Sequence, residues 1–221
     1  MKSPTAAVFD MDGTLVDNMQ FHVDAWLTLT AKRGLSLTRE LFERTYAGMK
    51  NEEILPLLFQ RELPKEEVAA LAHEKEEQYR ALYRKHLAPL PGLMPLLDRL
   101  KKAGVRCAVA TAAPPGNREL VLDGLDLRKR FEHVIGAEHA ARGKPAPDIY
   151  LAAAKALGVQ PSDCVAFEDA INGVLSARAA GMECVAVLTT TPEEQLRQAG
   201  ARWILKDFTT LPADLEARLG L

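Results

Sequence analysis

The chain has 221 residues, of which 48% are hydrophobic and 26% are charged, a composition typical of a globular core with at most a modest insertion. It argues against intrinsic disorder and against collagen-like structure. The 28 Lys and Arg residues against 30 Asp and Glu residues give a net charge of −2, without the basic excess that binds nucleic acid or an anionic membrane.

The first predicted element is a strand over Ala6–Phe9, and the interval that follows it, residues 17–87, has a helical pattern throughout. Apolar residues recur there at spacings of three and four among many charges, which is typical of amphipathic helices. The helices are predicted over Val23–Arg33, Arg39–Tyr46, Asn51–Gln60 and Lys65–His86. We therefore expect an all-helical subdomain inserted after the first strand, with residues 1–16 and 88–221 forming the core.

From residue 93 onward, short apolar runs alternate with helical patterns. The runs predict strands over Val105–Ala110, Val134–Ile135, Val165–Phe167, Val185–Leu188 and Trp203–Leu205. The intervening helices are predicted over Leu93–Ala103, Arg118–Leu125, Asp148–Leu157, Asn172–Ala180 and Glu193–Ala199. Because the runs do not alternate strictly, they indicate strands covered on both faces, as in parallel sheets. This order predicts an α/β fold with a doubly wound, Rossmann-like parallel sheet.

No stretch approaches the roughly 18 uncharged apolar residues that a membrane span needs. The apolar run near the N-terminus is also too short for the core of a signal peptide. The three cysteines, Cys107, Cys164 and Cys184, lie in Val- and Ala-rich runs without zinc-binding spacing, so we interpret them as core residues of a reducing compartment. We expect a cytoplasmic protein, a monomer, with no nucleic-acid or membrane partner.

Polar side chains gather at the predicted carboxyl ends of the strands, where open α/β sheets bind their ligands. They are Asp10 and Asp12 after the first strand, Thr111 after the second, Lys144 past the third, and Glu168 with Asp169 after the fourth. Several carboxylates brought together need protons or a cation. Hard oxygen ligands suit Mg²⁺, which also accepts phosphate oxygens. A hydroxyl and an ammonium group beside it would bind phosphate.

These motifs, Asp10-Met11-Asp12-Gly13-Thr14-Leu15, Thr111, Gly143-Lys144-Pro145 and Glu168-Asp169, resemble in order the four motifs of the haloacid dehalogenase superfamily. The chain resembles in particular its β-phosphoglucomutase-like phosphatase branch, which has a small helical cap after the first motif. The resemblance spans nearly the whole chain, and it implies Mg²⁺-dependent phosphoryl transfer through an aspartyl-phosphate.

The resemblance also implies a role for each motif residue. Asp10 would be the nucleophile and a metal ligand, and Asp12 the general acid/base, with its backbone carbonyl on Mg²⁺. Asp169 would bind the metal, as would Glu168, directly or through water. The set would be completed by two phosphate-binding residues, which are Thr111 and Lys144.

Structural alternatives exist for each motif. The first motif could be a plain turn after a strand. Thr111 could cap the next helix, and Lys144 could be a solvated loop residue. Glu168 and Asp169 could simply favour a helix N-terminus. The joint placement of the four motifs favours the functional reading of each.

Three cap residues resemble substrate-contacting positions of the family. His22 lies near the hinge, where mutase-like relatives carry a histidine that assists at the closed site; the alternative is a structural histidine. Lys75 resembles a cap lysine that contacts a phosphate, or it could pair with charges along its own helix. Residues 47–51 resemble the specificity loop, which contains Lys50.

The chain departs from the mutase pattern at positions that would grip a bisphosphate. Mutases carry a lysine and an arginine where this chain has Ala47 and Asn51, and a serine and a lysine where it has Ala113 and Pro114. Lys50 could substitute in part. The sequence therefore favours a phosphatase of a small phosphorylated metabolite, such as a sugar phosphate. The alternatives are a sugar-phosphate mutase and a non-catalytic phosphate-binding module.

Overall fold

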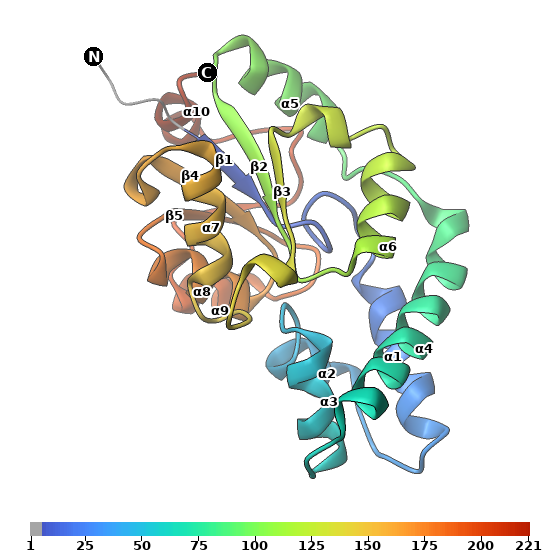
Figure 1. Ribbon diagram of the computed structural model, residues 1–221. Coiled ribbons are helices and arrows are strands. Elements are labelled where there is room, and N and C mark those ends of the chain that lie inside the picture. Colours follow the sequence, from blue (N-terminus) through green and yellow to red (C-terminus); the bar gives the residue numbers. More distant parts are fainter. Residues whose placement is uncertain (1–5) are drawn as a thin grey trace.

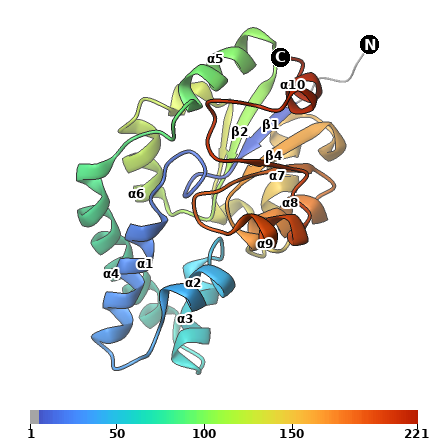
Figure 2. The same cartoon turned by 180° about the vertical axis from the view of Figure 1, so that it is seen from behind.

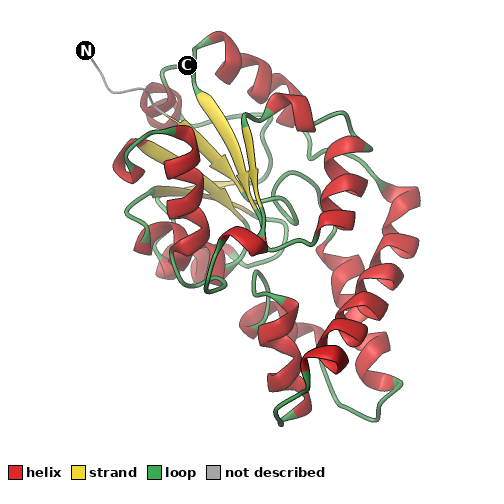
Figure 3. Ribbon diagram, viewed as in Figure 1, coloured by secondary structure: helices red, strands yellow, loops and turns green. Residues whose placement is uncertain are grey.

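Residues 6–221, which the computed structural model describes, fold around a sheet of six parallel strands (Figures 1 and 3). The strands are β1 (Ala6–Phe9), β2 (Arg106–Ala110), β3 (His133–Ile135), β4 (Cys164–Glu168), β5 (Glu183–Val187) and β6 (Trp203–Leu205). Their order in the sheet is β3-β2-β1-β4-β5-β6. The order reverses beside β1, and a reversal of this kind opens a ligand crevice at the carboxyl ends of the strands.

Helices cover both faces of the sheet (Figures 1 and 2). Side chains of β1 alternate, because Ala6 and Val8 face one hydrophobic cluster while Ala7 and Phe9 face the other. One face packs against α7 (Asp148–Leu157), α8 (Ile171–Ala179) and α9 (Glu193–Ala199). The other packs against α5 (Leu93–Lys102), a π-helical segment (Glu119–Asp123) that continues α6 (Pro115–Arg118), and α10 (Ala213–Leu219).

The remaining helices form a separate cap at the carboxyl end of the sheet (Figure 1). They are α1 (Met19–Ala31), α2 (Arg39–Thr45), α3 (Asn51–Phe59) and α4 (Lys65–Tyr83). Their apolar faces form a cluster of their own, centred on buried Trp26 and Phe42, that reaches the core at Ala170. The two linkers between cap and core touch where the Leu90 N–H donates to the Leu15 carbonyl at 2.8 Å.

The predicted fold class is confirmed, and the six predicted strands are present with ends that differ by two residues or fewer. The helix predicted over Arg118–Leu125 is present but begins three residues earlier, at Pro115, and is π-helical over Glu119–Asp123. A proline in the first turn of a helix was the missed start signal. The seven-residue α10 was not predicted, and the first cap helix begins four residues earlier than expected, at Met19.

The three cysteines are buried and unbridged, which agrees with their interpretation as core residues. Among the helices of residues 6–221, none has the length and apolar character that crossing a membrane requires.

Candidate active site

The strands deliver four polar side chains to one edge of the sheet. Asp10 follows β1, Thr111 follows β2, Glu168 ends β4, and Asp169 comes directly after it. Because these strands are parallel neighbours, their carboxyl ends meet at the same edge. All four side chains are buried there, under the cap.

Lys144 joins this group from the loop that precedes α7. Its Nζ lies 2.7 Å from Asp10 Oδ1 and 2.6 Å from Glu168 Oε1. The Tyr150 hydroxyl donates a further hydrogen bond of 2.5 Å to the same Glu168 oxygen. The alternative of a solvated loop lysine therefore does not hold, because Lys144 is only 2% exposed.

Three carboxylates share this one ammonium group, and the pKa values of Asp10 and Asp169 reflect the imbalance. Burial raises the pKa of Asp10 to about 8 against the opposing charge of Lys144, and Glu168 adds to the rise. Burial and the neighbouring carboxylates raise the pKa of Asp169 well above its usual value. Burial alone would lower the pKa of Lys144, but Asp10 and Glu168 raise it. The cluster is thus short of positive charge.

The donor set fits a divalent cation. Asp10, Glu168 and Asp169 can each offer a carboxylate oxygen, and these oxygens lie within 4.8 Å of one another. A hard divalent cation prefers oxygen ligands and would supply the positive charge that these carboxylates lack. The Thr190 hydroxyl orients Asp169 through a 2.5 Å hydrogen bond to its Oδ2. Glu168 is held by close packing, because a Cβ on Gly173 would lie 2.0 Å from its carboxyl group.

Asp12 occupies a different environment, outside the three-carboxylate group. Asn18 Nδ2 donates to Asp12 Oδ1 at 2.6 Å, and Asn18 Oδ1 accepts the Gly13 N–H at 3.0 Å. His22 Nε2 lies 3.5 Å from the second Asp12 oxygen. The loop after β1 therefore holds two aspartates two residues apart: Asp10 belongs to the three-carboxylate group, and Asp12 contacts Asn18 and His22 at the start of the cap.

Thr111 lines the same cavity with its hydroxyl proton available. Its Oγ1 accepts the Ala113 N–H at 3.0 Å, which leaves the hydroxyl free to donate. The next helix, α6, has Pro114 at its N-cap, so Thr111 does not cap it. The helix-capping alternative is thereby excluded for this residue.

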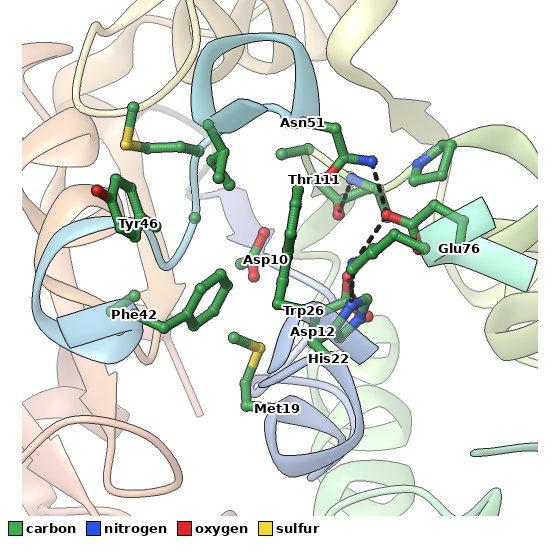
Figure 4. A pocket seen from close by; sticks show the side chains of 18 of the residues that line it. Asp10, Asp12, Met19, His22, Trp26, Phe42, Tyr46, Asn51, Glu76 and Thr111 are labelled. Carbon is green, nitrogen blue, oxygen red and sulfur yellow. Dashed lines mark hydrogen bonds and ion pairs between the residues drawn. The ribbon is translucent and has the colours of Figure 1, made fainter. Parts of the chain in front are cut away.

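The cavity lies between the core and the cap (Figure 4). Asp10, Asp12 and Thr111 line its core side, which we call the floor of the cavity. Phe42 and Tyr46 line one side of the cap wall, and the opposite side carries polar residues of α3 and α4 (Figure 4). A ligand with a phosphate on the floor would place the rest of its structure against this mixed wall.

Two of the cap residues singled out in the sequence lie at the cavity. His22 stacks on Tyr79 with ring centroids 3.6 Å apart, and its Nδ1 lies 2.8 Å from Lys75 Nζ. Lys75 is buried and contacts Glu76, the next residue of its own helix, at 2.9 Å. It therefore does pair with a charge of that helix, but in the cavity wall and not on a solvated face.

Lys50 lies elsewhere. Its Nζ donates to the Ala140 carbonyl of the core at 2.6 Å, and it does not line the cavity. Nearby, Glu53 Oε1 accepts the Gly143 N–H at 2.9 Å. The first turn of α3 thus fastens the cap to the loop that carries Lys144.

Sequence reasoning missed several residues of the site. Thr190 follows β5, so the strand-end argument would have found it had it been extended by one strand. Tyr150 and Asn18 carried no motif signal. Glu76 was overlooked among the many charges of α4, although both of its carboxylate oxygens are hydrogen-bonded in the cavity wall.

The chain belongs to the haloacid dehalogenase-like hydrolase family, whose sequence pattern matches residues 4–181. Its cap and parallel sheet are those of the β-phosphoglucomutase-like branch. The structure is similar to that of a β-phosphoglucomutase from Clostridium difficile, with a TM-score of 0.86, 26% sequence identity, and coverage of 98% of this chain and 97% of the other.

Characterised relatives include both a phosphatase and a mutase. The chain is 36% identical over 182 residues to the fructose-1-phosphate phosphatase YqaB of Escherichia coli K12, an alignment that covers 81% of this chain and 94% of the relative. It is 34% identical over 218 residues to the β-phosphoglucomutase of Bacillus subtilis 168, with 95% and 92% covered. Sequence similarity alone therefore leaves the choice between hydrolysis and isomerisation to the residues of the site.

Proposed function

We propose that the protein is a Mg²⁺-dependent phosphatase that hydrolyses a small phosphorylated metabolite, such as a sugar phosphate, through an aspartyl-phosphate. The observation that carries the proposal is that two aspartates on the cavity floor lie in unlike environments. Asp10 lies 2.7 Å from Lys144, whereas Asp12 is hydrogen-bonded to Asn18 near the hinge. Such a difference suits one carboxylate to attack and the other to transfer a proton.

In the first step an Asp10 oxygen attacks phosphorus, and the bond between phosphorus and the leaving oxygen breaks. The Asp12 carboxyl gives its proton to that oxygen, and the alcohol departs. In the second step Asp12 takes a proton from a water molecule, whose oxygen attacks phosphorus. The bond to Asp10 then breaks, which releases phosphate and restores both carboxyl groups.

Thr111 and Lys144 would hold the phosphoryl oxygens through both steps, one as a hydrogen-bond donor and the other as a positive charge. Magnesium, held by Asp10, Asp169, Glu168 and the backbone carbonyl of Asp12, would supply the positive charge that the carboxylate cluster lacks and stabilise charge on the phosphoryl group. Burial under the cap keeps bulk water from screening these interactions.

The pairing of the cap lysines with other groups favours hydrolysis over isomerisation. A mutase must hold a bisphosphate by its far phosphate while the sugar turns round. Lys50 is bound to the Ala140 carbonyl, and Lys75 is paired with Glu76. Among the described cavity-lining residues, the cap therefore offers no unpaired cation to a second phosphate. The mutase remains the second candidate because of the β-phosphoglucomutase relative.

Phosphate release from a panel of sugar and sugar-alcohol phosphates tests the proposal. We expect release with Mg²⁺, loss of release in excess chelator, and recovery when Mg²⁺ is added back. Full activity in excess chelator would contradict the metal requirement. Binding of these compounds without any release or isomerisation would favour the phosphate-binding module instead.

A further inference from the structure

Glu76 places a buried carboxylate in the wall of a cavity that receives a phosphorylated compound. It lies on α4 and is 5% exposed, yet it lines the cavity beside Asn51 and Trp26 (Figure 4). The proposed reaction gives this residue no role. A buried carboxylate is costly unless it is paired, so its partners show what holds it there.

Both oxygens of Glu76 are held by hydrogen bonds. Oε1 accepts from Asn51 Nδ2 at 2.7 Å and from Lys75 Nζ at 2.9 Å. Oε2 accepts from Asn117 Nδ2 of the core at 2.7 Å, and Asn117 Oδ1 in turn accepts from Arg80 at 2.7 Å. The carboxylate is thus fixed between cap and core. A carboxylate oxygen with one partner can still accept a second hydrogen bond.

The group is ionised. Burial alone would raise the pKa of Glu76, but the charge of Lys75, the neighbouring His22 and the hydrogen bond from Asn51 lower it to about 2. A full negative charge therefore stands in the cavity wall at neutral pH.

Glu76 also determines what Lys75 can do. Lys75 is 2% exposed, and its ammonium lies between Glu76 and His22 Nδ1 and faces the rings of Trp26 and Tyr79 at 5.3 and 5.7 Å. Its charge is balanced by its neighbour and its protons point to existing partners. The wall consequently presents hydrogen-bond acceptors and a balanced ion pair, where an anion would need a free cation.

We propose that Glu76 determines substrate specificity by selecting phosphate esters whose leaving group is an uncharged, hydroxyl-rich chain or ring. Hydroxyl groups donate to the acceptors of this wall. A second phosphate or a carboxylate on the same molecule would lose its hydration there without gaining a free cation, because Lys75 is already paired with Glu76. This inference rests on the proposed function, because it concerns the part of the substrate that departs from the phosphate.

Desolvating a carboxylate without a cation partner costs enough free energy for a preference of about tenfold or more. Specificity of this kind excludes the wrong ligand by leaving its charge unpaired. A neutral amide of the same shape would keep the hydrogen bond from Asn117. It would also free the Lys75 charge to attract an anion.

Two ligands that differ at one carbon test the inference: sorbitol 6-phosphate ends in a hydroxymethyl group, and 6-phosphogluconate ends in a carboxylate. Both are titrated by calorimetry, with Mg²⁺, into Asp10→Asn protein and into the Asp10→Asn/Glu76→Gln double variant. We expect the first protein to bind sorbitol 6-phosphate about tenfold or more tightly than 6-phosphogluconate. The Glu76→Gln change should remove most of that preference, chiefly by tightening 6-phosphogluconate.

The matched control is Glu77→Gln, because Glu77 lies on the same helix but has an exposed side chain paired with Arg80. It should leave the preference unchanged. The Lys75→Met/Glu76→Gln variant removes both buried charges together and leaves neither unpaired, so it tests the inference even if Glu76→Gln protein does not fold. It frees no cation and should therefore keep the discrimination against the carboxylate; loss of the discrimination would contradict the role of the Lys75–Glu76 pair.

Equal affinity of the two ligands for Asp10→Asn protein, or an unchanged ratio after Glu76→Gln, would overturn the inference. These titrations do not need turnover, so they stand apart from the activity panel. A protein that discriminates in binding but hydrolyses nothing would refute the phosphatase and keep the selectivity. Binding of neither ligand would overturn both.

Discussion

Gly13 lies directly against the carboxylate of Asp169: a Cβ added to Gly13 would fall 2.0 Å from Asp169 Oδ2. Gly13 also has a φ of +79°, in the left-handed region that favours glycine. The turn after β1 and the carboxylate after β4 therefore fit together only because position 13 has no side chain. The glycine of the first motif is therefore needed for the position of the Asp169 carboxylate, apart from its role in the turn.

Gly13→Ala should reduce phosphatase activity by about 100-fold or more, because a displacement near 1 Å of a catalytic group has costs of this order. Asp169 must move away from the new methyl group, which also weakens Mg²⁺ binding. Steady-state kinetics over a range of Mg²⁺ concentrations measure both effects.

Gly34→Ala is the control for backbone strain. Gly34 has a similar φ of +68°, but nothing lies within 4 Å of its added Cβ. Its substitution should lower stability and leave the Mg²⁺ dependence unchanged. Equal effects of the two substitutions on activity would show that crowding of Asp169 is unimportant.

The fold and the floor of the cavity could be predicted from the sequence because both follow from local patterns. Apolar runs gave the strands, and parallel order brings their ends to one edge. Asp10, Thr111, Glu168 and Asp169 were therefore expected to converge, and they do. The start and the type of the helix that follows Thr111 were harder to predict, because its π-helical segment has no distinctive apolar period.

The cap wall could not be predicted in the same way. Neighbouring residues of a helix usually face apart, so nothing in the sequence indicates that Lys75 and Glu76 contact each other. The hydrogen bond between Glu76 and Asn117 joins residues 41 positions apart and depends on how the cap lies on the core. The hydrogen bond from Lys50 to the Ala140 carbonyl likewise joins residues 90 positions apart and depends on how the cap lies on the core.

Asp10→Asn should abolish turnover and leave the fold intact. The amide is nearly isosteric with the carboxylate but is a far weaker nucleophile. It also removes one negative charge from a buried group of three carboxylates, so the thermal midpoint should not fall substantially. Phosphate release and thermal unfolding, measured on the same preparation, test the two parts.

Asp24→Asn, at an exposed surface aspartate paired with Arg39, is the matched control and should keep full activity. Turnover retained by Asp10→Asn protein, after contaminating phosphatase has been excluded, would mean that another residue attacks phosphorus.

Glu76 should also make stability depend on pH. Its folded-state pKa of about 2 lies below its ordinary value of 4.5, so its contribution is fully present above about pH 4.5 and is lost as pH falls toward 2. The pH-dependent part is on the order of 3 kcal/mol over that whole interval. Urea unfolding of wild-type and Glu76→Gln protein between pH 7 and pH 3 should show a stability difference that shrinks with acidity. A difference independent of pH would mean that Glu76 is not a stabilising charge.

The last prediction concerns the fate of the aspartyl-phosphate. A mutase returns the phosphoryl group to a sugar, which requires the far phosphate of a bisphosphate intermediate to be held while the sugar turns. Where mutases have cations or polar groups this chain has Ala47, Asn51, Ala113 and Pro114. Asn51 donates its amide to Glu76, and Ala113 and Pro114 line the cavity without a charge.

Two or more missing charge-assisted contacts, each worth about 1.5–3 kcal/mol, would weaken binding of the bisphosphate by a factor on the order of hundreds or more. The intermediate should then leave or be hydrolysed. We expect β-glucose 1-phosphate, with or without a bisphosphate primer, to give little glucose 6-phosphate, while at least one sugar phosphate releases inorganic phosphate faster. Phosphorus NMR of the product mixture measures this partition directly. Efficient, primer-dependent isomerisation with negligible phosphate release would make the protein a mutase that holds its intermediate through other contacts.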